Sequence, residues 1–136
     1  MGPESFSERL THWRVGTEQE ITLYEGTDAI NLRRYPQCFL LSAQLTQQPP
    51  PTQIAMETWL RLGGASLAYF RGALSVEPST GQLWLLQCVS QEANPAALFT
   101  QLESLLNQRD TWRSTVKRLA RTPKNLGPTP LRAQFY

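Results

Sequence analysis

Residues 72–90 read GALSVEPSTGQLWLLQCVS, and this stretch decides the fold class. Two strand-like runs, Gly72–Glu77 and Gln82–Ser90, flank the residues Pro78-Ser79-Thr80-Gly81, which are typical of a turn. A connection this short predicts an antiparallel hairpin. The second run is apolar on both faces, because Leu83, Leu85, Gln87 and Val89 alternate with Trp84, Leu86 and Cys88. We therefore expect a strand that is central in a sheet or covered on both sides.

Three more strands are predicted before this hairpin. Their ranges are Glu20–Tyr24, Ala29–Arg34 and Cys38–Leu45, and residues 26–28 and Pro36 separate them. In the third strand, apolar side chains share one face at a period of two, namely Phe39, Leu41, Ala43 and Leu45. Because short connections join antiparallel neighbours, the five runs predict one antiparallel sheet.

Helical patterns lie before, between and after these strands. The first helix is expected over residues 5–14, where Ser5 and Glu8 fit a capping box. The second follows the Pro49-Pro50-Pro51 run and is expected from Gln53 to about Phe70. Gly63 and Gly64 interrupt its apolar pattern, so either the helix ends there or another segment packs closely on it. We favour a continuous helix with a close contact.

The third helix begins at Asn94-Pro95, an asparagine cap followed by a proline at the first helical position. Apolar residues at steps of three, four and seven continue it to about Arg121, and Pro123 stops it. The order of elements is therefore α-β-β-β-α-β-β-α. This order predicts an α+β fold, an antiparallel sheet with helices packed on it. We expect Trp84 and Trp112 to lie in its core.

A chain of 136 residues is expected to form one domain, here residues 1–121. Residues 122–136 are predicted to be a flexible, proline-rich basic tail. No apolar run approaches the roughly 18 residues of a membrane span. The N-terminal residues also lack the pattern of a signal peptide, so a cytoplasmic location is expected.

The charge is distributed unevenly along the chain. Residues 1–108 carry six arginines against ten acids, whereas residues 109–136 carry seven basic residues against Asp110 alone. Binding of nucleic acid by the basic segment is one interpretation. A solvated helix face is the simpler one, because no aromatic residue is interleaved with the cations until Phe135. The pair Arg33-Arg34 is likewise interpreted as a solvated strand end.

The composition removes several classes of chemistry. One histidine, His12, and two cysteines, Cys38 and Cys88, are too few for a tetrahedral zinc site. Gly63-Gly64 lacks the Lys-Ser/Thr of a phosphate-binding loop, and no constellation fills the roles of a catalytic site. Both cysteines are interpreted as small buried apolar residues rather than a disulfide. We therefore expect a binding protein, with no catalytic residues, no metal and no cofactor.

The order of elements, the hairpin at residues 72–85 and the closing helix with Phe99, Leu102, Leu106 and Trp112 resemble one known family. It is the class I chaperones of type III secretion systems, the Tir chaperone-like family. The resemblance covers residues 5–121 and lies in the pattern of elements, since the family has no catalytic signature.

The resemblance implies a cytosolic homodimer, or a heterodimer with a chaperone-like paralogue. It also implies that the protein binds an extended segment of a secreted effector and keeps it competent for export, through β-augmentation and helix-in-groove contacts. Family members are usually acidic, so the basic segment favours a divergent member as an alternative. Such a member would bind a transcriptional activator or anti-activator, or a component of the secretion apparatus.

Six apolar residues are candidates for a partner or dimer interface. Those on the third strand face either the core or a partner, and those on the second helix lie where the family forms its dimer interface. They are Phe39, Leu41, Leu45, Trp59, Leu62 and Leu67. For each of them, an ordinary core position is the alternative interpretation.

Overall fold

The computed structural model describes residues 5–66 and 71–121, and its elements follow the predicted order. The strands are β1 (Glu20–Glu25), β2 (Asp28–Arg34), β3 (Cys38–Gln44), β4 (Ala73–Val76) and β5 (Leu83–Ser90). The helices are α1 (Phe6–Val15), α2 (Gln53–Ser66) and α3 (Pro95–Arg121). The α+β class is therefore confirmed. Residues 67–70, predicted as the end of the second helix, and the predicted tail 122–136 lie outside the described residues.

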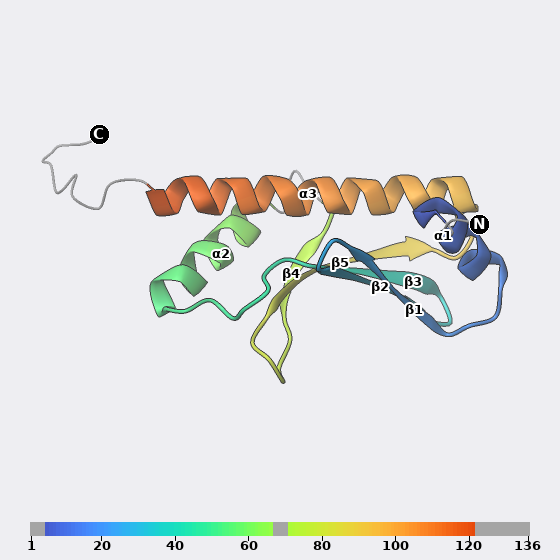
Figure 1. The fold of residues 1–136 in the computed structure, drawn as a ribbon, viewed down its shortest axis with the longest axis horizontal. Helices are drawn as coiled ribbons and strands as arrows, with labels where there is room; N and C mark the ends of the chain where they lie inside the picture. Colours follow the sequence, from blue (N-terminus) through green and yellow to red (C-terminus); the bar gives the residue numbers. More distant parts are fainter. Residues whose placement is uncertain (1–4, 67–70, 122–136) are drawn as a thin grey trace, which may run out of the picture.

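The five strands form one antiparallel sheet in the order β1-β2-β3-β5-β4 (Figure 1). Gly26 and Gly81, which lie in the turns after β1 and β4, have φ angles of 65° and 76°. Glycine adopts positive φ without steric cost, so both hairpins follow from turn chemistry that the sequence displays. β5 lies between β3 and β4, which confirms the predicted central strand, while β1 and β4 form the edges.

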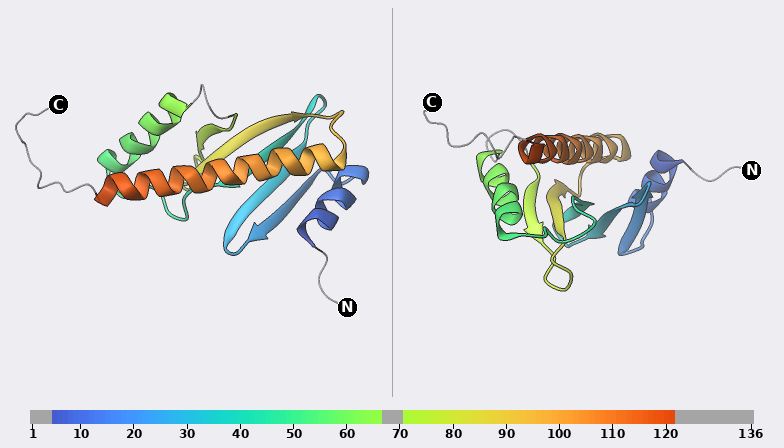
Figure 2. Two further views of the ribbon diagram at one scale, coloured as in Figure 1. Left: turned by 90° about the horizontal axis from the view of Figure 1, so that it is seen from above. Right: turned by 60° about the vertical axis from the view of Figure 1, so that its left-hand side comes forward.

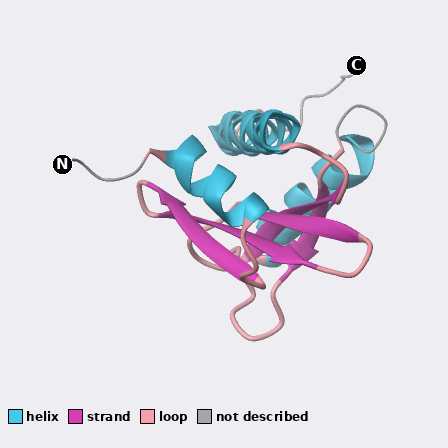
Figure 3. Ribbon diagram, turned by 90° about the vertical axis from the view of Figure 1, so that its right-hand side faces the viewer, coloured by secondary structure: helices cyan, strands magenta, loops and turns pink. Residues whose placement is uncertain are grey.

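The helices leave one face of the sheet uncovered. α3 runs along the other face, α1 lies beside the first part of α3, and α2 packs on α3 and β4 (Figures 1 and 2). No described helix lies over the opposite face (Figure 3). Within residues 5–66 and 71–121, none of these helices combines the length and the apolarity needed to cross a bilayer.

The core lies between α3 and the sheet. Leucines on α3, together with the fully buried Trp112, pack against alternate residues of the strands: Leu23, Ile30, Leu32, Phe39, Leu41, Leu83 and Leu85. This arrangement confirms the predicted apolar face of the third strand and the predicted core position of Trp112. It also defines the uncovered face of the sheet, because side chains alternate between the two faces along every strand.

Arg34 holds α1 against the sheet, contrary to its prediction as a solvated strand end. Its guanidinium lies 4.4 Å from the ring centroid of Trp13 and donates hydrogen bonds to the backbone oxygens of Trp13 and Gly16. The guanidinium of Arg14, on α1, lies 5.0 Å from the ring centroid of Phe39 on β3. Partial burial lowers the pKa of Arg34 from its usual value, and the nearby charge of Arg14 lowers it further. Arg33 is exposed, so the prediction holds for that residue alone.

α2 passes through Gly63 and Gly64 without a break, as predicted. A Cβ atom added to Gly63 would lie 3.3 Å from two side-chain atoms of Leu74, whereas one added to Gly64 would meet nothing within 4 Å.

We expect Gly64→Ala to stabilise the protein by about 0.5–1 kcal/mol, since alanine is the better helix former. Gly63→Ala should gain less or destabilise, because overpacking typically costs about 1–3 kcal/mol. Urea unfolding of both variants tests this, and equal stabilisation would contradict the close contact.

Candidate binding surface on the uncovered face of the sheet

The uncovered face carries a mixed apolar and polar surface. Trp84 and Leu86 on β5 and Leu40 on β3 are its half-buried apolar residues, and Tyr24 on the outer strand is 64% exposed. Each alternates along its strand with a residue that points into the core. The face therefore presents large side chains that the chain itself leaves partly open to solvent.

A hollow of about 330 Å³ lies in the middle of this face. All five strands and the turn after β4 contribute to its lining, which consists of Thr22, Asn31, Ser42, Ser75, Val76, Glu77, Pro78, Trp84 and Leu86. Its volume is at the lower end of the range for ligand sites, roughly 300–1,000 Å³. The hollow can therefore accommodate one or two side chains of a bound segment. Its hydroxyl and amide groups can form hydrogen bonds with the backbone of that segment.

Trp84 was predicted to be a core residue, and this prediction is wrong. It lies half-buried on the uncovered face and lines the hollow, while its neighbours Leu83 and Leu85 are fully buried on the other face. Cys38 and Cys88 are free thiols and form no disulfide, as predicted, but neither is buried as expected, because Cys88 is exposed and Cys38 is half-buried. The sequence pattern correctly separated the two faces of β5, but it did not show that only one of them is covered.

The edge formed by β1 borders the same face. β1 pairs with β2 alone, so in the described part of the chain its outer backbone groups have no strand partner. An unpaired edge can accept an additional strand from another chain. Glu20 receives hydrogen bonds from Asn31 and Arg33, which lower the pKa of its carboxyl group from the usual value. This end of the face is thus polar, whereas the end near Trp84 is apolar.

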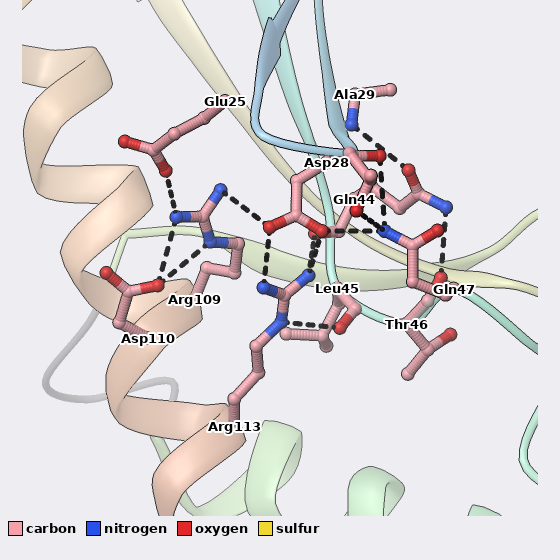
Figure 4. Close-up of polar contacts among 11 residues, drawn as sticks. Glu25, Asp28, Ala29, Gln44, Leu45, Thr46, Gln47, Arg109, Asp110 and Arg113 are labelled. Atoms are coloured by element: carbon pink, nitrogen blue, oxygen red, sulfur yellow. Dashed lines mark hydrogen bonds and ion pairs between the residues drawn. The ribbon is translucent and has the colours of Figure 1, made fainter.

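A polar cluster at the turn between β1 and β2 fixes this edge to α3 (Figure 4). Asp28 accepts two hydrogen bonds from Arg113, at 2.8 Å and 2.9 Å, and a third from Gln47 at 2.8 Å. These bonds, above all those from Arg113, lower the pKa of the Asp28 carboxyl group from its usual value. Arg113 also donates to the backbone oxygens of Gln44 and Leu45 at the end of β3.

Arg109 is the most buried member of this polar cluster, since its side chain is 4% exposed. It pairs with Glu25 and Asp110 and lies 3.9 Å from Asp28. Two of the seven basic residues after residue 108 therefore neutralise acids of the same chain. This use of Arg109 and Arg113 reduces the positive charge that the basic segment can offer to a nucleic acid.

No protein-family model and no curated protein matches this sequence. Solved structures do match. A chain of the ExsC–ExsE complex has a TM-score of 0.61 at 14% identity, over 79% of this chain and 91% of that one. A chain of the HopA1–SchA chaperone–effector complex has a TM-score of 0.57 at 17% identity, over 71% of this chain and 76% of that one. A chain of the heterodimeric ExoU–SpcU complex from the type III secretion system of Pseudomonas aeruginosa has a TM-score of 0.54 at 15% identity, over 81% of this chain and 96% of that one.

The fold is that of type III secretion chaperones. The predicted resemblance is therefore confirmed at the level of the fold. The similarity extends over most of this chain and of each matched chain.

Within this chaperone fold, most of the predicted interface residues are buried in the single chain. Phe39, Leu41 and Leu45 lie on the core face of the sheet, and Trp59 on α2 is buried in the same core. Leu62 is half-buried and borders a hollow between α2 and α3. Leu67 lies outside the described residues. A role for these six residues in an interface stays a prediction, whereas Trp84 and Leu86 are the surface residues that sequence reasoning missed.

Proposed function

We propose that this protein is a non-catalytic type III secretion chaperone, which binds a segment of a secreted effector in the cytoplasm and keeps it competent for export. The observation that carries the proposal is the hollow around Trp84, which lies on the uncovered sheet face of a chaperone fold. The HopA1–SchA structure supports it, because that neighbour is a complex of a chaperone with an effector.

The bound segment is expected to be extended. Its backbone adds a strand to the outer edge of β1, and apolar side chains after the strand enter the hollow on Trp84 and Leu86. Main-chain hydrogen bonds then hold the segment with little sequence preference, while the hollow selects the apolar positions. A segment held in this way cannot fold independently, and that is the condition an export channel requires.

A regulatory protein is the alternative partner, as the basic segment of the sequence suggested. The uncovered face fits an extended segment of either class, so the two versions of the function differ in the identity of the captured protein and not in the site.

The test uses a photo-cross-linking amino acid in place of Leu86, within the full chain expressed in its native host. We expect cross-links to one segment of a secreted protein, identified by mass spectrometry. Cross-links to a transcriptional regulator would support the alternative, and the absence of any segment specific to position 86 would overturn the site. A cross-linker at the exposed Glu103 on α3 controls for non-specific capture.

Trp84 should dominate the affinity for the segment identified in this way. We expect Trp84→Ala to weaken binding of the corresponding synthetic peptide by about 30- to 100-fold, because aromatic residues at the centre of an interface often contribute 2 kcal/mol or more. Isothermal titration calorimetry measures the affinity. Val15→Ala, at an apolar residue of α1 that is exposed away from the hollow, is the matched control and should leave it unchanged.

A further inference from the structure

Two free thiols lie close together on the uncovered face of the sheet, Cys38 on β3 and Cys88 on β5. Both side chains point to this face, because Phe39 and Val89, the residues that follow them, are buried on the other one. Cys88 is exposed and Cys38 is half-buried, so solvent reaches the pair. Neither cysteine lines the hollow around Trp84. The two thiols therefore form a separate cluster that the proposed binding of a segment does not use.

The register of the two strands places the cysteines on a diagonal. Cys38 is paired with Ser90 and Cys88 is paired with Leu40, so each cysteine is two residues away from the position opposite the other. The side chains are nonetheless in contact. The Cys38 thiol is hydrogen-bonded to Cys88, and this bond raises the pKa of Cys38 above its usual value. The sheet thus holds two sulfur atoms near one another without a covalent bond between them.

This diagonal arrangement disfavours a disulfide. A disulfide requires Cα atoms about 4.4–6.8 Å apart, whereas diagonal neighbours on antiparallel strands are about 7–8 Å apart. The backbones cannot move closer along the diagonal without a change of register, because β3 and β5 are paired from Cys38 to Gln44. A bridging metal ion avoids this conflict. It separates the sulfurs by two metal–thiolate bonds of roughly 2.3 Å each, in place of one S–S bond of about 2.0 Å.

The ligands select a soft metal ion of low coordination number. Thiolates prefer soft ions, among them Cu(I), whereas Mg²⁺ and Ca²⁺ require oxygen ligands. Structural zinc requires four ligands. Within residues 5–66 and 71–121, no group of three or more histidine, cysteine or carboxylate side chains is placed to hold a metal. Cu(I) is the ion that fits, because its filled d shell imposes no geometry and two thiolates in a line satisfy it.

We propose that Cys38 and Cys88 form a two-coordinate binding site for Cu(I) on the uncovered face of the sheet. Each thiol releases its proton to solvent and supplies one thiolate sulfur, so one monovalent ion replaces two protons. The copper keeps its oxidation state, and binding consumes no oxidant or reductant. β3 and β5 are already paired in the sheet, so the ion joins two strands without any rearrangement of the fold.

Anaerobic titration of the full chain with Cu(I), in competition with a chromogenic Cu(I) chelator, measures the binding. We expect one ion per chain, and X-ray absorption of the loaded protein should give two sulfur ligands. Cys38→Ser and Cys88→Ser should each weaken binding at least tenfold, with circular dichroism confirming that both variants fold. Trp84→Ala should leave binding unchanged, so a failure of this site is distinguishable from a failure of the proposed function.

Two results of the titration would overturn the proposal. A single serine variant that binds Cu(I) as tightly as the parent would show that one thiol is sufficient. Half an ion per chain, together with copper-dependent dimerisation in sedimentation equilibrium, would show that the ion joins two copies instead of two strands.

Ser90→Cys combined with Cys88→Ser tests the diagonal geometry. The double variant places two thiols directly opposite one another, where Cα atoms are about 4.5–5.5 Å apart and within the range of a disulfide. After incubation with oxidised glutathione, alkylation and mass spectrometry should find a disulfide in this variant and two free thiols in the parent. A parent chain that forms its disulfide as readily would show that the pair is a redox site, and would overturn the proposal.

Discussion

Replacing Gln108 with alanine is expected to lower the free energy of unfolding by about 3 kcal/mol. Gln108 is a buried polar residue of α3, 2% exposed. Its side-chain oxygen accepts a hydrogen bond from the backbone N–H of Gly72 at 3.0 Å, and its side-chain nitrogen donates to the carbonyl of Gly72 at 2.9 Å. The substitution leaves both backbone groups of Gly72 without these partners, and each unsatisfied buried group costs about 1–3 kcal/mol.

Urea unfolding followed by circular dichroism measures this loss. The neighbouring Asn107 is exposed on the same helix, and Asn107→Ala should change the free energy by less than about 0.5 kcal/mol. If the two alanine variants have equal free energies of unfolding, the hydrogen bonds to Gly72 make no net contribution to stability, which would contradict the prediction.

Gly72 provides a second test of the same contact. A Cβ atom at this position would lie 2.6 Å from Leu105 Cδ1 and 2.7 Å from Gln108 Oε1, distances at which neighbouring atoms must move. Gly72→Ala alone should therefore destabilise by about 2 kcal/mol. In the Gln108→Ala background it should cost less, because one of the two obstructing side chains has been removed.

The sequence predicted the local features of the fold well. The glycines of the two turns, the Ser5–Glu8 capping box and the Asn94 cap each act through residues close in the chain, and the structure confirms all of them. The strand order up to β3 also follows from short connections. Such features depend on local geometry, which a residue pattern contains directly.

Contacts between residues far apart in the sequence were not predictable. Gln108 and Gly72 are 36 residues apart, and Arg113 and Asp28 are 85 apart, so no periodicity connects them. The same limit explains Trp84. Alternation along β5 separated its two apolar faces, but which face α3 covers depends on how the whole chain is arranged. An apolar face of this kind is therefore compatible with both a core and a binding surface.

Replacing Asp28 with asparagine is the second change with a large expected effect, a loss of about 2–3 kcal/mol near neutral pH. The substitution keeps the shape of the side chain but removes the charge that the polar cluster neutralises. Arg113 then loses its bidentate carboxylate partner, and the buried Arg109 loses one of its nearby acids (Figure 4). Glu20→Gln is the matched control on the same hairpin. Its ion pair with Arg33 is exposed on both sides, so its loss should destabilise the protein much less than the loss of the Asp28 carboxylate.

The effect of Asp28→Asn should depend on pH in a defined direction. The hydrogen bonds from Arg113 lower the pKa of Asp28 in the folded protein. In the unfolded chain an aspartate has a pKa near 3.9. The stabilisation is therefore complete above about pH 4 to 5 and is lost as the pH falls through the lower pKa of the folded state. The difference in unfolding free energy between the parent and Asp28→Asn should be constant from about pH 7 to pH 5 and should shrink below about pH 4.

The pKa of Glu20 is also lowered, but Glu20 is present in both proteins, so the difference isolates Asp28. A difference that persists in strong acid would show that asparagine destabilises through its shape, and one that disappears near neutral pH would show that Asp28 is not paired as a carboxylate.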